Sequence, residues 1–324
     1  MASDRKKDEG LEYVRSAEKH LKTSLLKWKP DYDSAADDYS KAATCFKGAR
    51  LFHQCKEYLL KASNCYSSNK SSFHAAKCLE QAILMCKELN DLSDVDDLAS
   101  QAATLFLEQG NREAASTVLD KGAKCLEELK PDASLRLYSR AAEVAHGEDS
   151  YKQAAEYISR AARLCVRIKE FDKAADLIRQ EIGFHQEAEQ LLPIGRLAVA
   201  LVLVQLARGD TVAAEKAFKE WGNCCEAPEV QTLEKLLQSF DEEDGEGARA
   251  ALNDPFIKHM DVEYSRLARD LPLPAPTVTT PRPSTVRQNA APSYVSPREQ
   301  GGSSTQPAAP KTPGSEDEFE GGLC

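Results

Sequence analysis

A small residue recurs about every twenty positions through the first 190 residues. The spacing between successive members is 20 in all steps but one, where it is 19. The members are Ala42, Ala62, Ala82, Ala102, Gly122, Ala141 and Ala161. Larger apolar residues lie three positions before and three after most of them, such as Leu59 and Cys65 around Ala62. Positions three apart share one face of a helix, so each unit predicts one amphipathic helix followed by a turn.

Single helices of this length cannot bury their apolar face alone, which predicts antiparallel pairs stacked into an array. Turn-forming residues stand where the helices should end: Asn69, Asn90, Gly110, Pro131 and Gly147. Two units give a repeat near forty residues, longer than the ~34 of a tetratricopeptide (TPR) repeat. We therefore expect an all-α fold, a TPR-like right-handed superhelix of antiparallel helix pairs, over residues 1–190.

The twenty-residue register stops after Gln190, where Glu181 has already broken the series of small residues. Four further segments read as helices: 196–208, 211–221, 229–240 and 246–269. We expect them to form a C-terminal helical bundle over residues 191–270. Ten of the fifteen prolines follow Leu271. This composition predicts that residues 271–324 form a disordered Pro/Ser-rich tail with an acidic C-terminus.

Charge and hydropathy narrow the class of protein further. A net charge of −10 disfavours nucleic-acid binding, which needs a surplus of Lys and Arg. The N-terminus lacks the apolar segment of a secretory signal, and the longest apolar run, residues 197–207, is shorter than the ~20 residues of a membrane span. These features predict a cytoplasmic protein.

Motifs for catalysis or metal binding are missing from the sequence. It has no HExxH, no phosphate-binding GxxxxGK[ST], no GxSxG and no CxxC pair among its ten cysteines. Four of the cysteines, Cys45, Cys65, Cys125 and Cys165, fall at matching repeat positions, as expected for small buried apolar side chains. We therefore expect no enzyme, no metal and no cofactor.

The first candidate binding feature is a row of cations one residue before the small residues. Five of its eight positions are basic and none is acidic, and further cations follow near the end of the array. The candidates are Lys41, Lys61, Lys121, Arg140, Arg160, Arg163 and Arg167. Either their stems cover helix joints, or they form a cationic strip for an elongated acidic partner. Alternate helices lie in opposite layers, so only half of the row can share a face.

Two further features lie near the ends of the chain. Leu25, Leu26 and Trp28 interleave with lysines after the first predicted helix, which suits either contact with a membrane surface or a turn that packs back on the array. The acidic end carries Glu318, Glu320 and Leu323. Such an end either confers solubility or docks a basic partner.

The residues of the segment GLEYVRSAEKHLKTSLLKWKPDYDSAADDYSKAATCFKGAR, the twenty-residue register and the acidic GGLC end together resemble the soluble NSF attachment protein (SNAP) family. The resemblance implies an adaptor that binds the four-helix SNARE bundle and recruits the hexameric ATPase NSF. NSF then disassembles the bundle in vesicle fusion and intracellular protein transport, including ER–Golgi transport. It implies a peripheral place on membranes, with membrane contact through Leu25, Leu26 and Trp28.

The same resemblance implies NSF contact through Glu318, Glu320 and Leu323, and SNARE contact through a basic face, for which the cation row supplies the candidates. Two alternatives stay open at this point. One is a generic helical-repeat scaffold that binds acidic peptides, and the other is a helical subunit that supports the active site of a partner, as in prenyltransferases.

Overall fold

The computed structural model describes residues 2–23 and 28–274. This part of the chain contains fifteen α-helices and one short 3₁₀ turn, and no strand. The array helices are α1 (Ala2–Leu21), α2 (Tyr32–Gly48), α3 (Phe52–Ser68), α4 (Ser72–Leu89), α5 (Val95–Glu108), α6 (Arg112–Leu126), α7 (Pro131–His146), α8 (Tyr151–Arg167) and α9 (Phe171–Glu187). The later ones are α10 (Leu192–Arg208), α11 (Thr211–Trp221), α12 (Ala227–Asp241), α13 (Gly245–Leu252), α14 (Pro255–Lys258) and α15 (Val262–Asp270). The predicted all-α, TPR-like superhelix is confirmed.

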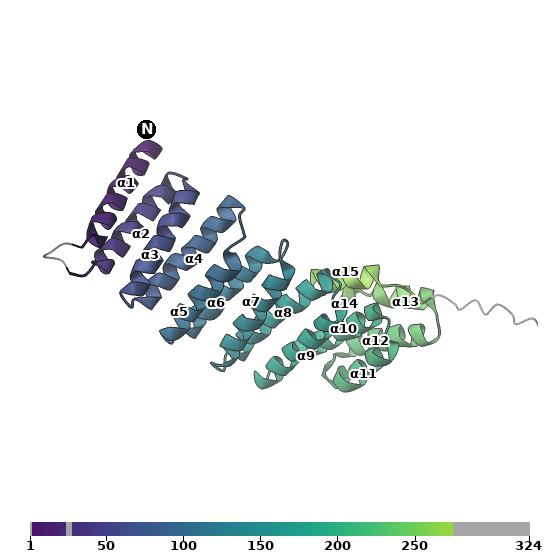
Figure 1. The fold of residues 1–324 in the computed structure, drawn as a ribbon. Coiled ribbons are helices and arrows are strands. Elements are labelled where there is room, and N and C mark those ends of the chain that lie inside the picture. Colours follow the sequence, from purple (N-terminus) through teal and green to yellow (C-terminus); the bar gives the residue numbers. More distant parts are fainter. Residues whose placement is uncertain (1, 24–27, 275–324) are drawn as a thin grey trace, which may run out of the picture. The chain divides into compact units, whose positions relative to one another are not determined.

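Helices α1 to α9 follow one another in chain order, each packed against the next (Figure 1). Side chains also join helices that are two apart in the sequence. Lys121 on α6 pairs with Glu80 on α4, and Arg140 on α7 donates to Thr104 on α5. The array therefore has an even-helix layer (α2, α4, α6 and α8) and an odd-helix layer (α3, α5, α7 and α9), as antiparallel pairing requires.

The small residues of the repeat are the centre of the core. All six alanines of the row have no exposed surface, and Gly122 is buried with them. The flanking pattern differs from the prediction in one respect. The residues four positions after the row, such as Phe46, Phe106 and Leu126, are more deeply buried than those three positions after it, such as Leu105. The buried face is therefore turned towards the +4 position in these helices.

The turns between helices repeat with the same period. A residue with positive φ closes most of the array helices: Arg50, Lys70, Asn90, Gly110, Asp149, Lys169 and Glu189. The next amide then donates to the carbonyl five residues earlier, as in the bond of 2.9 Å from the Ser71 amide to the Tyr66 carbonyl. This is the Schellman arrangement, which satisfies carbonyls at the end of a helix. The α6–α7 turn uses Pro131 at the first helical position instead.

Helix α10 is the centre of a second apolar cluster. Its side chains from Ile194 to Leu206 are nearly all buried, so it is apolar around its whole circumference. The same cluster includes Ala162 of α8 and Ile178 of α9. The described helices belong to one compact unit. The division of the chain near residue 190 stays a prediction.

The predicted helix 246–269 is wrong in its continuity, because three helices occupy that range. Asp254 and Asp261 each accept a hydrogen bond from an amide two residues on, which starts a new helix, and Pro255 takes the first position of α14. The last of these helices, α15, returns to the array. Asp261 at its start pairs with Arg163 on α8 at 2.7 Å.

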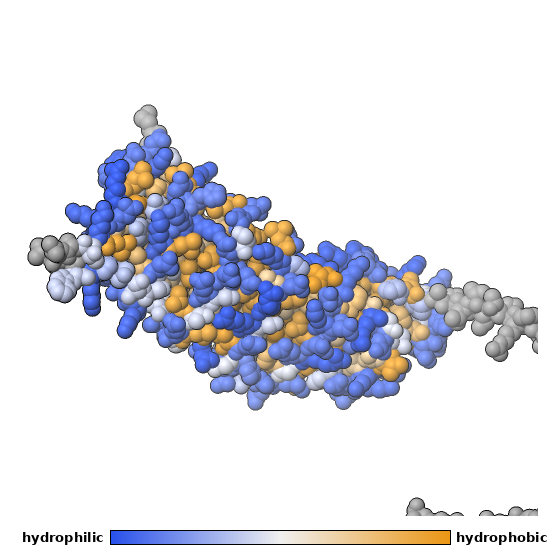
Figure 2. All heavy atoms as spheres, in the orientation of Figure 1, coloured by the Kyte–Doolittle hydropathy of each residue, from blue (hydrophilic) through white to orange (hydrophobic). Residues whose placement is uncertain are grey.

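Figure 2 shows one face of the protein, with hydrophilic residues over most of it and smaller hydrophobic patches between them. Among the described helices, none combines the length and the apolar character needed to cross a membrane.

Candidate partner-binding surfaces

The predicted cation row lies on the surface, and its members already have partners within the chain. On the array, Lys41 pairs with Asp38 at 3.5 Å and Lys61 with Glu57 at 2.7 Å. Arg160 contacts both Asp120 and Glu156. Arg163 pairs with Asp261, and Arg167 with Glu127 at 2.8 Å. The ion pairs orient these cations, so an acidic partner would have to compete with carboxylates of the chain itself.

The Glu80–Lys121 ion pair is partly shielded from water. Its side chain is 14% exposed, and it accepts from Lys121 and, at 2.9 Å, from Lys77. Burial alone would raise the pKa of Glu80, but the hydrogen bonds from the two lysines outweigh it, and the pKa is lowered. Glu80 therefore stays ionised and keeps Lys121 on the surface of the even-helix layer.

The seven candidate cations do not share one layer. Lys61 and Arg140 belong to α3 and α7, which are odd-helix-layer elements. The others belong to α2, α6 and α8 of the even-helix layer: Lys41, Lys121, Arg160, Arg163 and Arg167. The structure thus divides the row in the way that antiparallel pairing predicts, with most of the cations on the even-helix layer.

Several of these cations gather where α6, α8 and the start of α15 meet. Arg160, Arg163, Arg167 and Lys124 line a hollow of about 270 Å³, together with three carboxylates. Sequence reasoning missed Lys124. It lies two residues after Gly122, the same repeat position that Arg163 holds after Ala161, so extending the search to that position would have found it.

The loop after α1 is described only in part. Trp28 has 88% of its surface exposed, so it does not pack back on the first helix pair. Leu25 and Leu26 lie outside the described residues, as do Glu318, Glu320 and Leu323 of the C-terminal motif. The roles given to these residues stay predictions.

The cysteines show no arrangement for chemistry in the described part of the chain. The nine cysteines there are free thiols. Burial raises the pKa of Cys55, Cys78 and Cys165 to about 11, which keeps them protonated at neutral pH. Residues 2–23 and 28–274 also hold no cluster of His, Cys, Asp and Glu that could bind a metal.

The described residues form a helical-repeat array, a fold class whose stacked repeats create extended surfaces for other proteins. The family model described as "Soluble NSF attachment protein, SNAP" matches residues 8–254. The chain belongs to the soluble NSF attachment protein family.

The chain is also similar to individual members of that family from several organisms. It is 26% identical to the gamma-soluble NSF attachment protein of Dictyostelium discoideum, over 82% of this chain and 83% of the relative. It is 25% identical to the gamma-soluble NSF attachment protein of Arabidopsis thaliana, over 80% and 90%. The alpha-soluble NSF attachment protein of Vitis vinifera is 27% identical over 72% and 83%. The two gamma proteins match a larger share of this chain, 82% and 80%, than the alpha protein, 72%.

Proposed function

We propose that this protein is an adaptor that binds SNARE complexes and recruits the ATPase NSF for their disassembly, in vesicle fusion and intracellular protein transport. The observation that carries the proposal is the family match, because it spans the helical array and most of the helices that follow it. The ATP chemistry would belong to NSF. This chain would supply position and contact, acting in the cytoplasm and peripherally on membranes.

The SNARE contact is assigned to the even-helix layer. A helical bundle is long and straight, so it can meet cations that recur along one layer of stacked helices. Lys41, Lys121 and Arg160 lie on α2, α6 and α8 of this layer, and Arg163 and Arg167 on α8 extend the set. Lys61 and Arg140, on the other layer, are left out of this contact.

Paired charge reversals test the assignment. We expect Lys41→Glu with Lys121→Glu to weaken binding to a purified SNARE complex at least about tenfold, because close charge pairs at interfaces contribute ~1.5 kcal/mol or more. The matched control is Lys61→Glu with Arg140→Glu, which makes the same change in net charge on the odd-helix layer. It should change the Kd less than about twofold. Equal losses in the two variants, with unchanged circular dichroism, would refute the choice of layer.

The membrane contact is assigned to Leu25, Leu26 and Trp28. Trp28 supports it, because an indole with 88% of its surface in water gains free energy on entering a lipid interface. We expect Trp28→Ser to reduce flotation of the protein with liposomes several-fold. Its thermal stability should stay the same, since the exposed ring contributes little to packing. Unchanged flotation would remove Trp28 from the membrane contact.

A further inference from the structure

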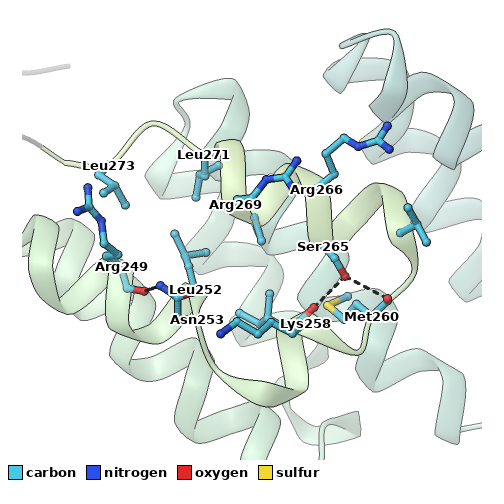
Figure 3. A pocket seen from close by; sticks show the side chains of 13 residues that line it. Arg249, Leu252, Asn253, Lys258, Met260, Ser265, Arg266, Arg269, Leu271 and Leu273 are labelled. Carbon is cyan, nitrogen blue, oxygen red and sulfur yellow. Dashed lines mark hydrogen bonds between the residues drawn. The ribbon is translucent and has the colours of Figure 1, made fainter.

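A hollow lies between α13, α14, α15 and the segment that follows α15 (Figure 3). Its volume is about 970 Å³, compared with about 270 Å³ for the hollow where α6, α8 and the start of α15 meet. It is separate from the cation row, which belongs to α2 through α8. None of the seven candidate cations lines it.

The inner wall of this hollow is apolar. Its lining includes Leu252, Ile257 and Leu271, which are buried, and Met260 and Leu273, which are half-buried. Figure 3 shows Leu252 and Leu271 towards the middle of the hollow, with polar side chains around them. An apolar wall of this kind favours a ligand that brings apolar side chains of its own.

The rim is basic. Arg249 of α13, Lys258 of α14, and Arg266 and Arg269 of α15 line it, and no carboxylate does. Arg266 reaches Glu263 only at 3.4 Å, and Arg269 pairs with its exposed neighbour Asp270. Arg249 and Lys258 form no ion pair with any described residue. In a chain with a net charge of −10, this rim keeps cations that the rest of the fold does not neutralise.

We propose that this basic-rimmed hollow is a docking site for a short acidic amphipathic segment of a partner protein. The carboxylates of that segment would meet the four rim cations, and one or two large apolar side chains would enter the hollow. Charge complementarity selects an acidic ligand, and the apolar wall selects an amphipathic one. The site goes beyond the proposed SNARE and NSF contacts.

The shape favours a protein segment over two other occupants. An anionic lipid surface is broad and flat, so it would contact the rim while leaving the concave apolar wall unfilled. A second copy of this chain would need an exposed face of matching charge and convexity. A narrow segment with acidic and apolar sides fits both the rim and the wall, as in groove recognition of amphipathic helices.

The test uses the full-length chain and a fluorescein-labelled synthetic peptide of about twelve residues, with Glu and Leu at helical spacing. A second peptide has Lys in place of Glu, and a third has Ser in place of Leu. Fluorescence anisotropy at physiological salt should show saturable binding of the Glu/Leu peptide. Each control peptide should bind at least about tenfold more weakly, because each lacks one of the two features that the site recognises.

Two matched variants locate the binding. Arg249→Glu with Lys258→Glu reverses the two rim cations that form no ion pair with a described residue, and it should weaken binding at least about tenfold. Lys216→Glu with Lys235→Glu makes the same change in net charge at exposed positions of α11 and α12 and should change the Kd less than about threefold. Because neither pair of residues is buried, both variants should keep the thermal stability of the parent protein.

Several outcomes overturn the proposal. It fails if the peptide does not bind, if both variants lose affinity equally, or if the serine-containing peptide binds as well as the leucine one. It also fails if the rim reversal instead abolishes binding to phosphatidylserine vesicles while peptide binding is unchanged. A concentration-dependent dimer that the rim reversal dissociates would assign the hollow to a second copy of the chain.

Discussion

At the scale of single residues, Glu181 is the exception to the repeat. It occupies the row that otherwise carries alanine or glycine, and it is 5% exposed. Its Oε2 atom has no hydrogen-bond partner, and neither does the hydroxyl of Tyr264 on α15. Burial raises the pKa of Glu181 to about 7. A hydrogen bond with Ser159 and the charge of Arg163 oppose this shift, whereas Asp261 adds to it. His185, one turn away, has a lowered pKa because of its own burial.

Glu181 therefore makes stability depend on pH. Its pKa is near 4.5 when the chain is unfolded and about 7 when it is folded, so the native state holds a proton that the unfolded state has released between these values. The neutral carboxyl contributes its full share of the free energy of unfolding below pH 4.5. About 3 kcal/mol of that free energy is lost as the pH rises through 7.

Glu181→Gln removes this titration while keeping a polar side chain of the same size. As the pH rises from 5 to 8, the free energy of unfolding of the variant should increase by about 2–3 kcal/mol relative to that of the parent protein. Urea unfolding at the two pH values measures the difference. If both proteins respond to pH in parallel, Glu181 is ionised throughout and the interpretation is wrong.

At the scale of elements, Gly122 and Ala99 show how neighbouring helices approach. A Cβ atom on Gly122 of α6 would lie 2.6 Å from the Cβ of Ala99 on α5 and 3.3 Å from Leu137 Cδ1 on α7. Ala99 in turn is the smallest residue at its repeat position, where Leu59 and Ile158 stand in other helices. The two small residues together let α5 and α6 come close, so neither can enlarge alone.

Gly122→Ala tests this contact. We expect it to lower the free energy of unfolding by about 1–3 kcal/mol, because overpacking forces the two helices apart. The matched control is Gly183→Ala in α9, where an added Cβ meets no atom within 4 Å. There the better helix propensity of alanine should raise stability by roughly 0.5–1 kcal/mol. Chemical denaturation of both variants decides the matter, and a neutral or stabilising Gly122→Ala would contradict the close approach.

The sequence was sufficient to predict elements whose signal repeats. Helices α2 to α9 were predictable because each carries the same apolar face at a fixed spacing. Their turns were harder, since Arg50, Lys70 and Lys169 adopt positive φ although these residue types do not favour it. The division of 246–269 depends on Asp254 and Asp261 acting as caps, a signal that was available but outweighed by the helical pattern.

The candidate sites were predictable to different degrees for a similar reason. The cation row follows the repeat, so the sequence revealed it together with its division between layers. The basic-rimmed hollow does not follow the repeat. Arg249, Lys258 and Arg269 are spread over three short helices, and only their tertiary packing brings them around one space. A site of this kind has no local pattern to detect.

At the scale of the whole molecule, this acidic chain carries two groups of surface cations that concern binding. Most of the cation row lies on the even-helix layer, and four further cations line the hollow of α13 to α15. An adaptor needs separate surfaces for separate partners, and the proposed function uses the array for SNAREs and the acidic C-terminal residues for NSF. In this function, one chain joins the SNARE complex to NSF.

The most direct measurement is the assembly of purified protein, SNARE complex and NSF with a non-hydrolysable ATP analogue, followed by velocity sedimentation. We expect a stable complex that contains all three components and that does not form when this protein is omitted. Deleting the last nine residues should leave SNARE binding intact and lower the stimulation of NSF ATPase activity. If the three components sediment separately, the adaptor role is contradicted.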